Sequence, residues 1–206
     1  NTTIGYPVNS GITVNANLRT DKFNLFNTSG YSYRDAPGNA FYDNTFTSTS
    51  SNFDRTIEER DYQRLRKGFN TNLGLEYFLT ESSSITGSVF YRNSDNESNT
   101  ENTIEKFDNN SLDERSFRTD DENEDDTNYQ FSLNYVNDLD EDGQKLTVDL
   151  QYSRGQEDKP SIIQQDLTIP KNERESLLNI YEIETENEYL VQADYVLPMG
   201  DAQFEV

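Results

Sequence analysis

The residues best suited to chemistry in this sequence are carboxylates, and they are concentrated in one segment. Residues 95–126 contain thirteen acidic and three basic side chains, which supply −10 of the chain's net charge of −22. Calcium ions prefer oxygen ligands of this kind. A site that binds or collects cations is therefore expected where acid is densest, in the sequence DDENEDD. The candidate metal ligands are Asp120, Asp121, Glu122, Glu124, Asp125 and Asp126.

Two acidic segments also have simpler interpretations. A run of like charge is usually a solvated loop that self-repulsion keeps extended, and this alternative applies to residues 95–126. The segment DLDEDGQKLTVD imitates a calcium-binding loop, with Asp138, Asp140 and Asp142 near its start and Asp149 at its twelfth position. An EF-hand needs a helix on each side of its calcium-binding loop. Here the segments on both sides alternate between apolar and polar residues, as strands do. A β-turn is therefore the better interpretation.

The residue inventory excludes several kinds of site. The chain has no cysteine and no histidine, so thiol nucleophiles, disulfides, histidine metal sites and Ser-His-Asp catalysis are unavailable. Carboxylate pairs such as Glu58 with Glu59 are sequence neighbours rather than groups facing each other across a cleft. No enzyme activity and no cofactor are expected. Nucleic acid is not an expected partner, because there is no basic stripe.

Composition alone would suggest disorder, since only 32% of residues are hydrophobic and the mean hydropathy is −0.96. Two features oppose that interpretation: 12% of residues are aromatic, and many apolar residues recur at a spacing of two. A transmembrane β-barrel needs apolar residues only on its lipid face, so it tolerates this composition. No apolar run approaches the roughly 20 residues of a transmembrane helix, and no signal peptide opens the chain.

The alternation predicts a series of antiparallel strands joined as hairpins. In YQFSLNY, for example, every second residue is aromatic or aliphatic, and the residues between them are polar. The predicted strands are residues 11–19, 22–34, 69–79, 84–94, 127–137, 144–154, 187–197 and 202–206, the last being only the start of a strand. On the apolar side, the residues expected to face lipid are Leu75, Val89, Leu133, Val148, Leu150 and Val191.

The connections between these strands alternate in length. The links TDK, LTESSS, VNDLDEDGQK and LPMGDA are short, whereas residues 35–66, 95–126 and 155–186 are expected to form long loops. Outer-membrane barrels have tight periplasmic turns and longer extracellular loops. Loop 155–186 is rich in Ile and Leu and is the best candidate for contact with a ligand or partner. The alternative is that its apolar residues extend the neighbouring strands.

Tyrosines recur at the ends of the predicted strands. One set closes the descending strands and another closes the ascending strands, at spacings of about 60 residues. Amphipathic rings favour a lipid–water boundary, so two aromatic belts are predicted. The alternative is the general preference of tyrosine for strands. The two sets are Tyr77, Tyr135 and Tyr195, and Tyr33, Tyr91 and Tyr152.

These patterns predict an all-β fold: an antiparallel transmembrane β-barrel segment of about eight strands, with short periplasmic turns and long extracellular loops. Residues 1–206 are expected to form part of one barrel domain, without a plug and without the remaining strands. The main alternative is a surface or secreted β-sandwich adhesin or binding module. A sandwich predicts one buried core and irregular turn lengths, and the regular alternation of lengths favours the barrel.

Several segments also resemble a known family. They are FNLFNTSGYSYRD, FNTNLGLEYFL with ITGSVFYRNSD, TNYQFSLNY with QKLTVDLQYS, and YLVQADYVLP. They resemble the outer-membrane β-barrel family of Bacteroidota, whose members are similar to TonB-dependent receptors. The resemblance concerns architecture and spans most of the chain. It implies an outer-membrane location, contact with outer-membrane lipid, assembly by the barrel assembly machinery, and uptake of a ligand energised by a TonB-type protein. A surface lipoprotein is a further implied partner.

Overall fold

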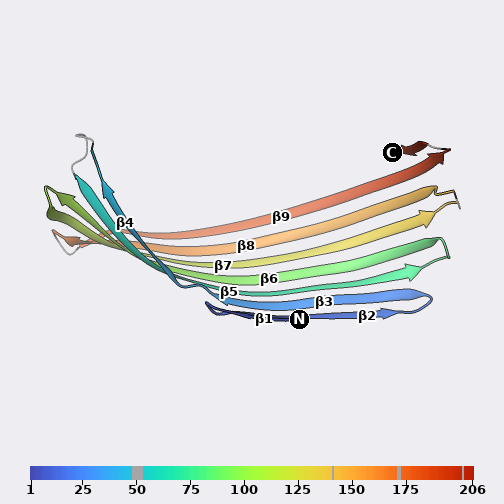
Figure 1. Ribbon diagram of the computed structural model, residues 1–206, viewed down its shortest axis with the longest axis horizontal. Helices are drawn as coiled ribbons and strands as arrows, with labels where there is room; N and C mark the ends of the chain where they lie inside the picture. The colour runs from blue at the N-terminus through green and yellow to red at the C-terminus, as the bar shows by residue number, and fades with distance from the viewer. Residues whose placement is uncertain (48–52, 141, 171–172, 201) are drawn as a thin grey trace.

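The protein is a single antiparallel β-sheet (Figure 1). The computed structural model describes residues 1–47, 53–140, 142–170, 173–200 and 202–206, and these residues contain ten strands and no helix. In this part of the chain no helix is long and apolar enough to cross a membrane. The strands are β1 (Thr2–Gly5), β2 (Asn9–Arg19), β3 (Phe23–Asp35), β4 (Gly38–Thr45), β5 (Arg55–Phe78), β6 (Ser83–Asp108), β7 (Ser111–Asp138), β8 (Lys145–Ile169), β9 (Glu173–Met199) and β10 (Ala202–Glu205).

Nearly every strand pairs with its neighbours in sequence, in the order β1-β2-β3-β5-β6-β7-β8-β9-β10. Strand β4 lies off this path and pairs with β5 beyond the end of β3. The break between β3 and β4 falls at Pro37, which has no N–H to donate to the ladder. Strands β3 and β4 therefore act as one interrupted strand along the whole length of β5.

The sequence prediction is confirmed in class and wrong in strand number. All pairings are antiparallel, and each of the eight predicted segments coincides with a strand or with part of one, to within one residue at either end. Ten strands rather than eight are present, because β1 and β4 were not predicted. The sheet is open: within the described residues, β1 and β10 lie on opposite edges and do not pair with each other.

The prediction of long loops is wrong for most of their length. Strands β5–β9 are 24 to 28 residues long and run through most of residues 55–66, 95–126 and 155–186. Residues 48–52 and 171–172 lie outside the described part. In residues 55–66 and 95–126 both faces of the sheet are mostly polar, so the alternation that marks a strand disappears while backbone pairing continues. In residues 155–186 apolar residues lie on both faces, Ile162 and Leu177 on one and Ile163 and Leu178 on the other, which also removes the alternation. The alternative that the apolar residues of 155–186 extend neighbouring strands is confirmed.

A two-residue turn connects β6 to β7 at the far end of the sheet. Asn109 and Asn110 both have positive φ, 48° and 63°. A type I′ hairpin turn requires positive φ at both central residues, and Asn tolerates it better than most residues. The dipeptide NN was therefore a readable turn signal within the predicted loop.

The two faces of the sheet differ in chemistry. The apolar face carries Leu75, Val89, Leu133, Leu150 and Val191, which the strand register places side by side in two adjacent rows. The opposite, polar face holds all six buried residues of the described part: Gly74, Ser94, Asn102, Ser116, Ser153 and Ser161.

No hydrophobic side chain in the described residues is buried. In the described residues the single sheet has no second layer (Figure 1). The side chains of its apolar face, such as Leu133 and Val191, are exposed. A β-sandwich requires two packed sheets around an apolar core. The structure therefore contradicts the sandwich alternative.

Aromatic side chains form a row across the apolar face. The register places Tyr91 opposite Tyr129 and Tyr152 opposite Tyr189. The rings of Tyr152 and Tyr189 lie 4.9 Å apart, and Phe131 stacks on Tyr152 at 6.5 Å. This row marks one boundary of an apolar surface, as the prediction of an aromatic belt requires.

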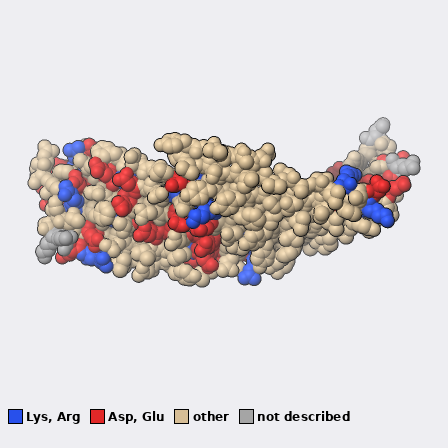
Figure 2. Space-filling model, turned by 90° about the horizontal axis from the view of Figure 1, so that it is seen from below, with Lys and Arg blue, Asp and Glu red and all other residues tan. Residues whose placement is uncertain are grey.

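Each long strand thus has two parts, one with few charged residues and one with many. In Figure 2 the first part appears as a nearly uncharged zone, with charged residues on both sides of it. The "apolar band" comprises residues 69–78 of β5, 83–91 of β6, 129–137 of β7, 146–152 of β8 and 189–197 of β9. The "charged extension" comprises residues 55–67 of β5, 93–108 of β6, 111–127 of β7, 154–169 of β8 and 173–187 of β9.

Candidate functional site

The acidic segment DDENEDD lies within β7, in the charged extension. Successive side chains of a strand point to opposite faces. The register places Asp120, Glu122, Glu124 and Asp126 on the polar face, whereas Asp121 and Asp125 lie on the opposite face. Carboxylates on the same face are about 7 Å apart along the strand. The strand therefore disperses the six predicted ligands.

Three of the four polar-face carboxylates, Glu122, Glu124 and Asp126, bind neighbouring strands, and Asp120 pairs with Arg118 of its own strand. Arg92 Nη2 lies 2.9 Å from Asp126 Oδ2, and Asn96 Nδ2 donates to Glu124 Oε1 at 2.7 Å. Within the described residues, no group of three or more Asp, Glu, His or Cys side chains is arranged to hold a metal ion. The cation site stays a prediction, and most of these acids act in the structure as cross-strand partners.

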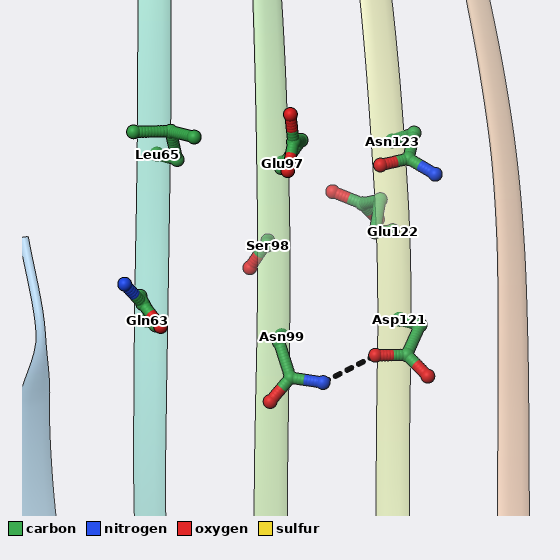
Figure 3. Close-up of a pocket in the computed structure, with 8 residues that line it drawn as sticks. All are labelled: Gln63, Leu65, Glu97, Ser98, Asn99, Asp121, Glu122 and Asn123. Carbon is green, nitrogen blue, oxygen red and sulfur yellow. Dashed lines mark hydrogen bonds between the residues drawn. The ribbon is translucent and has the colours of Figure 1, made fainter. Parts of the chain in front are cut away.

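A first hollow of about 370 Å³ lies in the charged extension of β5, β6 and β7 (Figure 3). In it, Asn99 of β6 points toward Asp121 of β7 and donates a hydrogen bond to its carboxylate. Lys67 Nζ lies 3.0 Å from Glu97 Oε1. This hollow can accept hydrogen bonds from a polar ligand. Its lining residues are Gln63, Leu65, Glu97, Ser98, Asn99, Asp121, Glu122 and Asn123.

A second hollow of about 400 Å³ lies on the polar face, between β5, β6 and β7. At its base, Asn102 is only 7% exposed, and the register places it between Arg60 and Arg118. Asn102 Nδ2 donates to Glu58 Oε1 at 2.9 Å, and Arg60 Nη2 lies 2.5 Å from the same oxygen.

Two polar atoms at the base of this hollow are unsatisfied. Asn102 Oδ1 and Arg60 Nε are buried and have no hydrogen-bond partner. Buried polar atoms normally have partners, because an unpaired one costs about 1–3 kcal/mol. The residues that line the hollow therefore include one acceptor and one donor that no protein group satisfies.

A third, acidic hollow of about 190 Å³ lies between β7, β8 and β9. Asp126, Glu157 and Glu184 are register partners across these three strands. Burial raises the pKa of Glu157, and the negative charges of Glu124, Glu184 and Asp126 raise it further, although nearby Lys159 opposes the shift. The surrounding carboxylates therefore disfavour the charged form of Glu157 at this hollow.

Sequence reasoning missed Glu58, Arg60, Asn102 and Arg118, because it assigned their segments to loops. The segment TIEERDYQRLRK gave no usable signal, because charged residues occupy both sets of alternate positions, Glu58 and Arg60 in one set and Glu59 and Asp61 in the other.

One comparison with known proteins is informative. Residues 137–206 match the model of the outer membrane protein beta-barrel family. The matched residues run from the end of β7 through β10. No curated protein matches the chain. Together with the antiparallel sheet, the match supports an outer-membrane β-barrel protein and confirms the predicted location in the outer membrane.

Proposed function

We propose that residues 1–206 form part of the barrel wall of a TonB-dependent receptor, which takes up a ligand across the outer membrane. In this proposal the apolar band contacts outer-membrane lipid and the polar face lines the lumen. The barrel assembly machinery inserts the strands, and a TonB-type protein energises transport. A surface lipoprotein is a further proposed partner. The protein has no enzymatic role, binds no nucleic acid and needs no cofactor.

The observation that carries the proposal is the mismatch between strand length and apolar band. Strand β6 has 26 residues, about 85 Å at 3.3 Å per residue, whereas a transmembrane strand needs about 9–11 residues. More than half of β6 therefore extends beyond the bilayer. Large projections above the membrane suit capture of a ligand or docking of a partner better than they suit a simple pore.

The second hollow also favours a receptor over a passive pore. A wide pore needs only a wall of hydrated polar groups. In this hollow, by contrast, Asn102 Oδ1 and Arg60 Nε are buried and have no hydrogen-bond partner. Binding sites place a few polar groups so that a ligand can complete their hydrogen bonds. The lining of this hollow is what a receptor needs to select its ligand.

Photo-crosslinking in intact cells tests the proposal without knowledge of the ligand. A benzophenone amino acid is placed at Gln192 on the polar face and, as the matched control, at the adjacent Val191 on the apolar face. We expect Gln192 to crosslink to a plug segment inside the lumen and Val191 to crosslink to lipid. A third probe at Asp21, in the turn between β2 and β3, reports on TonB.

Each probe has a defined contrary outcome. Protein crosslinks at Val191 with none at Gln192 would contradict the assignment of the two faces. A crosslink from Asp21 to a TonB-type protein, lost when the proton gradient is collapsed, is expected. If Asp21 gives the same products in cells that lack TonB, the receptor assignment is wrong even if the barrel assignment holds.

A further inference from the structure

Three arginines gather on the polar face of β3 and β5, in a chain whose net charge is −22. Arg34 of β3 lies directly opposite Arg66 of β5 in the register. Arg64 is two residues from Arg66 on the same face, and its backbone bonds with Ala36 just past the end of β3. Like charges in directly opposite positions destabilise a sheet. The cluster therefore has a cost that internal packing does not explain.

These arginines differ from most others in the charged extension. Arg55, Arg60, Arg92, Arg115 and Arg118 each form an ion pair with a carboxylate. In the part of the chain that the structure describes, Arg34, Arg64 and Arg66 have no such ion pair.

The guanidinium of Arg64 instead lies over the ring of Tyr62, 4.9 Å from its centroid. Such stacking occupies the face of a guanidinium and leaves its N–H groups free. Three guanidinium groups are thus available to a ligand at one place.

The cluster lines a hollow of about 720 Å³. Across the hollow, Asn96 Nδ2 donates to Glu124, while Asn96 Oδ1 is buried and has no hydrogen-bond partner. Glu122 and Glu124 line the same side. The hollow therefore presents cationic donors on β3 and β5 and, on β6, the one unsatisfied acceptor, Asn96 Oδ1. The carboxylates on β7 already have partners, Lys159 for Glu122 and Asn96 for Glu124.

We propose that Arg34, Arg64 and Arg66 bind the anionic group, a carboxylate or a phosphate, of a solute ligand, an inference that rests on the proposed function. Arginine binds both oxyanions through a planar pair of N–H donors. Asn96 Oδ1 accepts a hydrogen bond from a donor beside that anion. The polar face thereby orients the ligand, with its anion toward β5 and its donor toward β6.

The ligand's size and its route follow from the same geometry. The hollow falls within the range of about 300–1,000 Å³ that small-molecule sites occupy. Since the arginines lie on the polar face, the lumen supplies the ligand rather than the bilayer. An anion here also relieves the repulsion between Arg34 and Arg66, so binding should stabilise the paired strands.

Calorimetric titration of the detergent-solubilised protein with inorganic phosphate, and separately with succinate, tests the site. We expect saturable binding of at least one anion, at least tenfold weaker in Arg66→Gln. Arg66→Lys keeps the charge but loses the planar donor pair and should fall between the two. Arg19→Gln is the matched control, because Arg19 lies at the opposite end of the same face and has no carboxylate partner among the described residues.

The outcomes separate the alternatives. Binding of phosphate alone or succinate alone identifies the ligand's anionic group. Absence of saturable binding for both anions overturns the proposal, and so does equal weakening by Arg19→Gln and Arg66→Gln, which would indicate general charge attraction. Circular dichroism verifies that each variant is folded. If Arg66→Gln does not fold, Arg64→Gln replaces it and should weaken binding likewise. Binding in detergent needs no TonB-type protein. The titration therefore tests the anion site separately from the receptor assignment, and either can fail without the other.

Discussion

The apolar band and the charged extension share one ladder of backbone hydrogen bonds, but their side chains differ. Strands β5–β9 pass from one region to the other, and the register between β5 and β6 runs unbroken from Arg55 to Phe78. In the band, side chains separate into an apolar and a polar face. In the extension this separation is lost: both faces are mostly polar in β5–β7, and apolar residues lie on both faces in β8 and β9. Backbone pairing therefore holds the sheet together, and side chains determine which medium surrounds it.

The band contains apolar groups that the protein itself does not cover. Leu133 is 41% exposed and Val191 is 77% exposed, in a molecule without a buried hydrophobic residue among those described. Exposed apolar surfaces of this extent mark contact with another molecule or with a membrane. Lipid is the covering that fits the outer-membrane location.

The extension relies instead on ion pairs between strands. Examples are Arg115 with Glu105 and Lys106 with Glu114, both of which join β6 to β7 near the turn. Each partly exposed pair contributes only about 0–1 kcal/mol. The band should therefore be sensitive to single substitutions and the extension tolerant of them.

The largest effect is expected for a charge on the apolar face of the band. Leu133→Lys should destabilise the protein by about 2–4 kcal/mol in a lipid-refolding titration, because an ammonium group would face hydrocarbon. The adjacent Asn134→Lys places the same charge on the polar face and should change stability little. Equal effects at the two positions would contradict the assigned faces.

A smaller effect is expected from a glycine in the band. The ring of Phe26 lies where a side chain at Gly74 would stand, whereas nothing lies within 4 Å of that position at Gly87. Gly74→Ala should therefore cost about 1–3 kcal/mol through displacement of the ring, and Gly87→Ala should be nearly neutral.

Chemical unfolding of the two glycine variants measures this difference. In a protein that already carries Phe26→Ala, Gly74→Ala should cost much less, because the ring that it would displace is absent. If the penalty persists without the ring, backbone strain rather than steric overlap is its cause.

An ion pair in the extension should matter less. Breaking the contact between Arg92 and Asp126 with Arg92→Gln should cost about 0.2–1 kcal/mol. A double-mutant cycle with Asp126→Asn isolates the coupling energy. High salt should reduce it further. A coupling energy as large as the Leu133→Lys penalty would invalidate the contrast between the two regions.

The smallest effect is a pH dependence at β8. The raised pKa of Glu157 means that the folded state binds its proton more tightly than the unfolded state. This contribution to stability is complete below the ordinary glutamate pKa of about 4.3 and is lost as pH rises through the folded value. Glu157→Gln should therefore stabilise the protein slightly at pH 7 and have no effect at pH 4. Thermal unfolding at both pH values measures this, and the opposite order would contradict the acidic repulsion at this hollow.

The sequence predicted the strands of the band because lipid imposes apolar residues on one face. In residues 69–79 apolar residues on the lipid face alternate with polar residues on the other face, and this period of two identifies the strand. It also predicted the tyrosine row, since ring chemistry restricts those residues to a boundary. The face assignments followed from the same period.

The sequence could not reveal the extension, because water surrounds both faces there. Asp, Asn and Glu are poor strand formers, and DDENEDD is therefore typical of a loop. Its strand conformation depends on partners such as Asn96, Arg92 and Lys159, which only the fold brings alongside it. The second hollow was missed for the same reason, since Arg60 and Arg118 are 58 positions apart in the sequence.

Accessibility along β8 tests the central contrast most directly. The chain has no cysteine, so single cysteines can be introduced from Leu146 to Asp166, spin-labelled, and probed in lipid with oxygen and a water-soluble nickel complex. We predict alternation from Leu146 to Tyr152, with even positions accessible to oxygen and odd positions to nickel. From Arg154 onward, every position should be accessible to nickel. Uniform accessibility across Leu146–Tyr152, or alternation that continues through Asp166, would contradict the account.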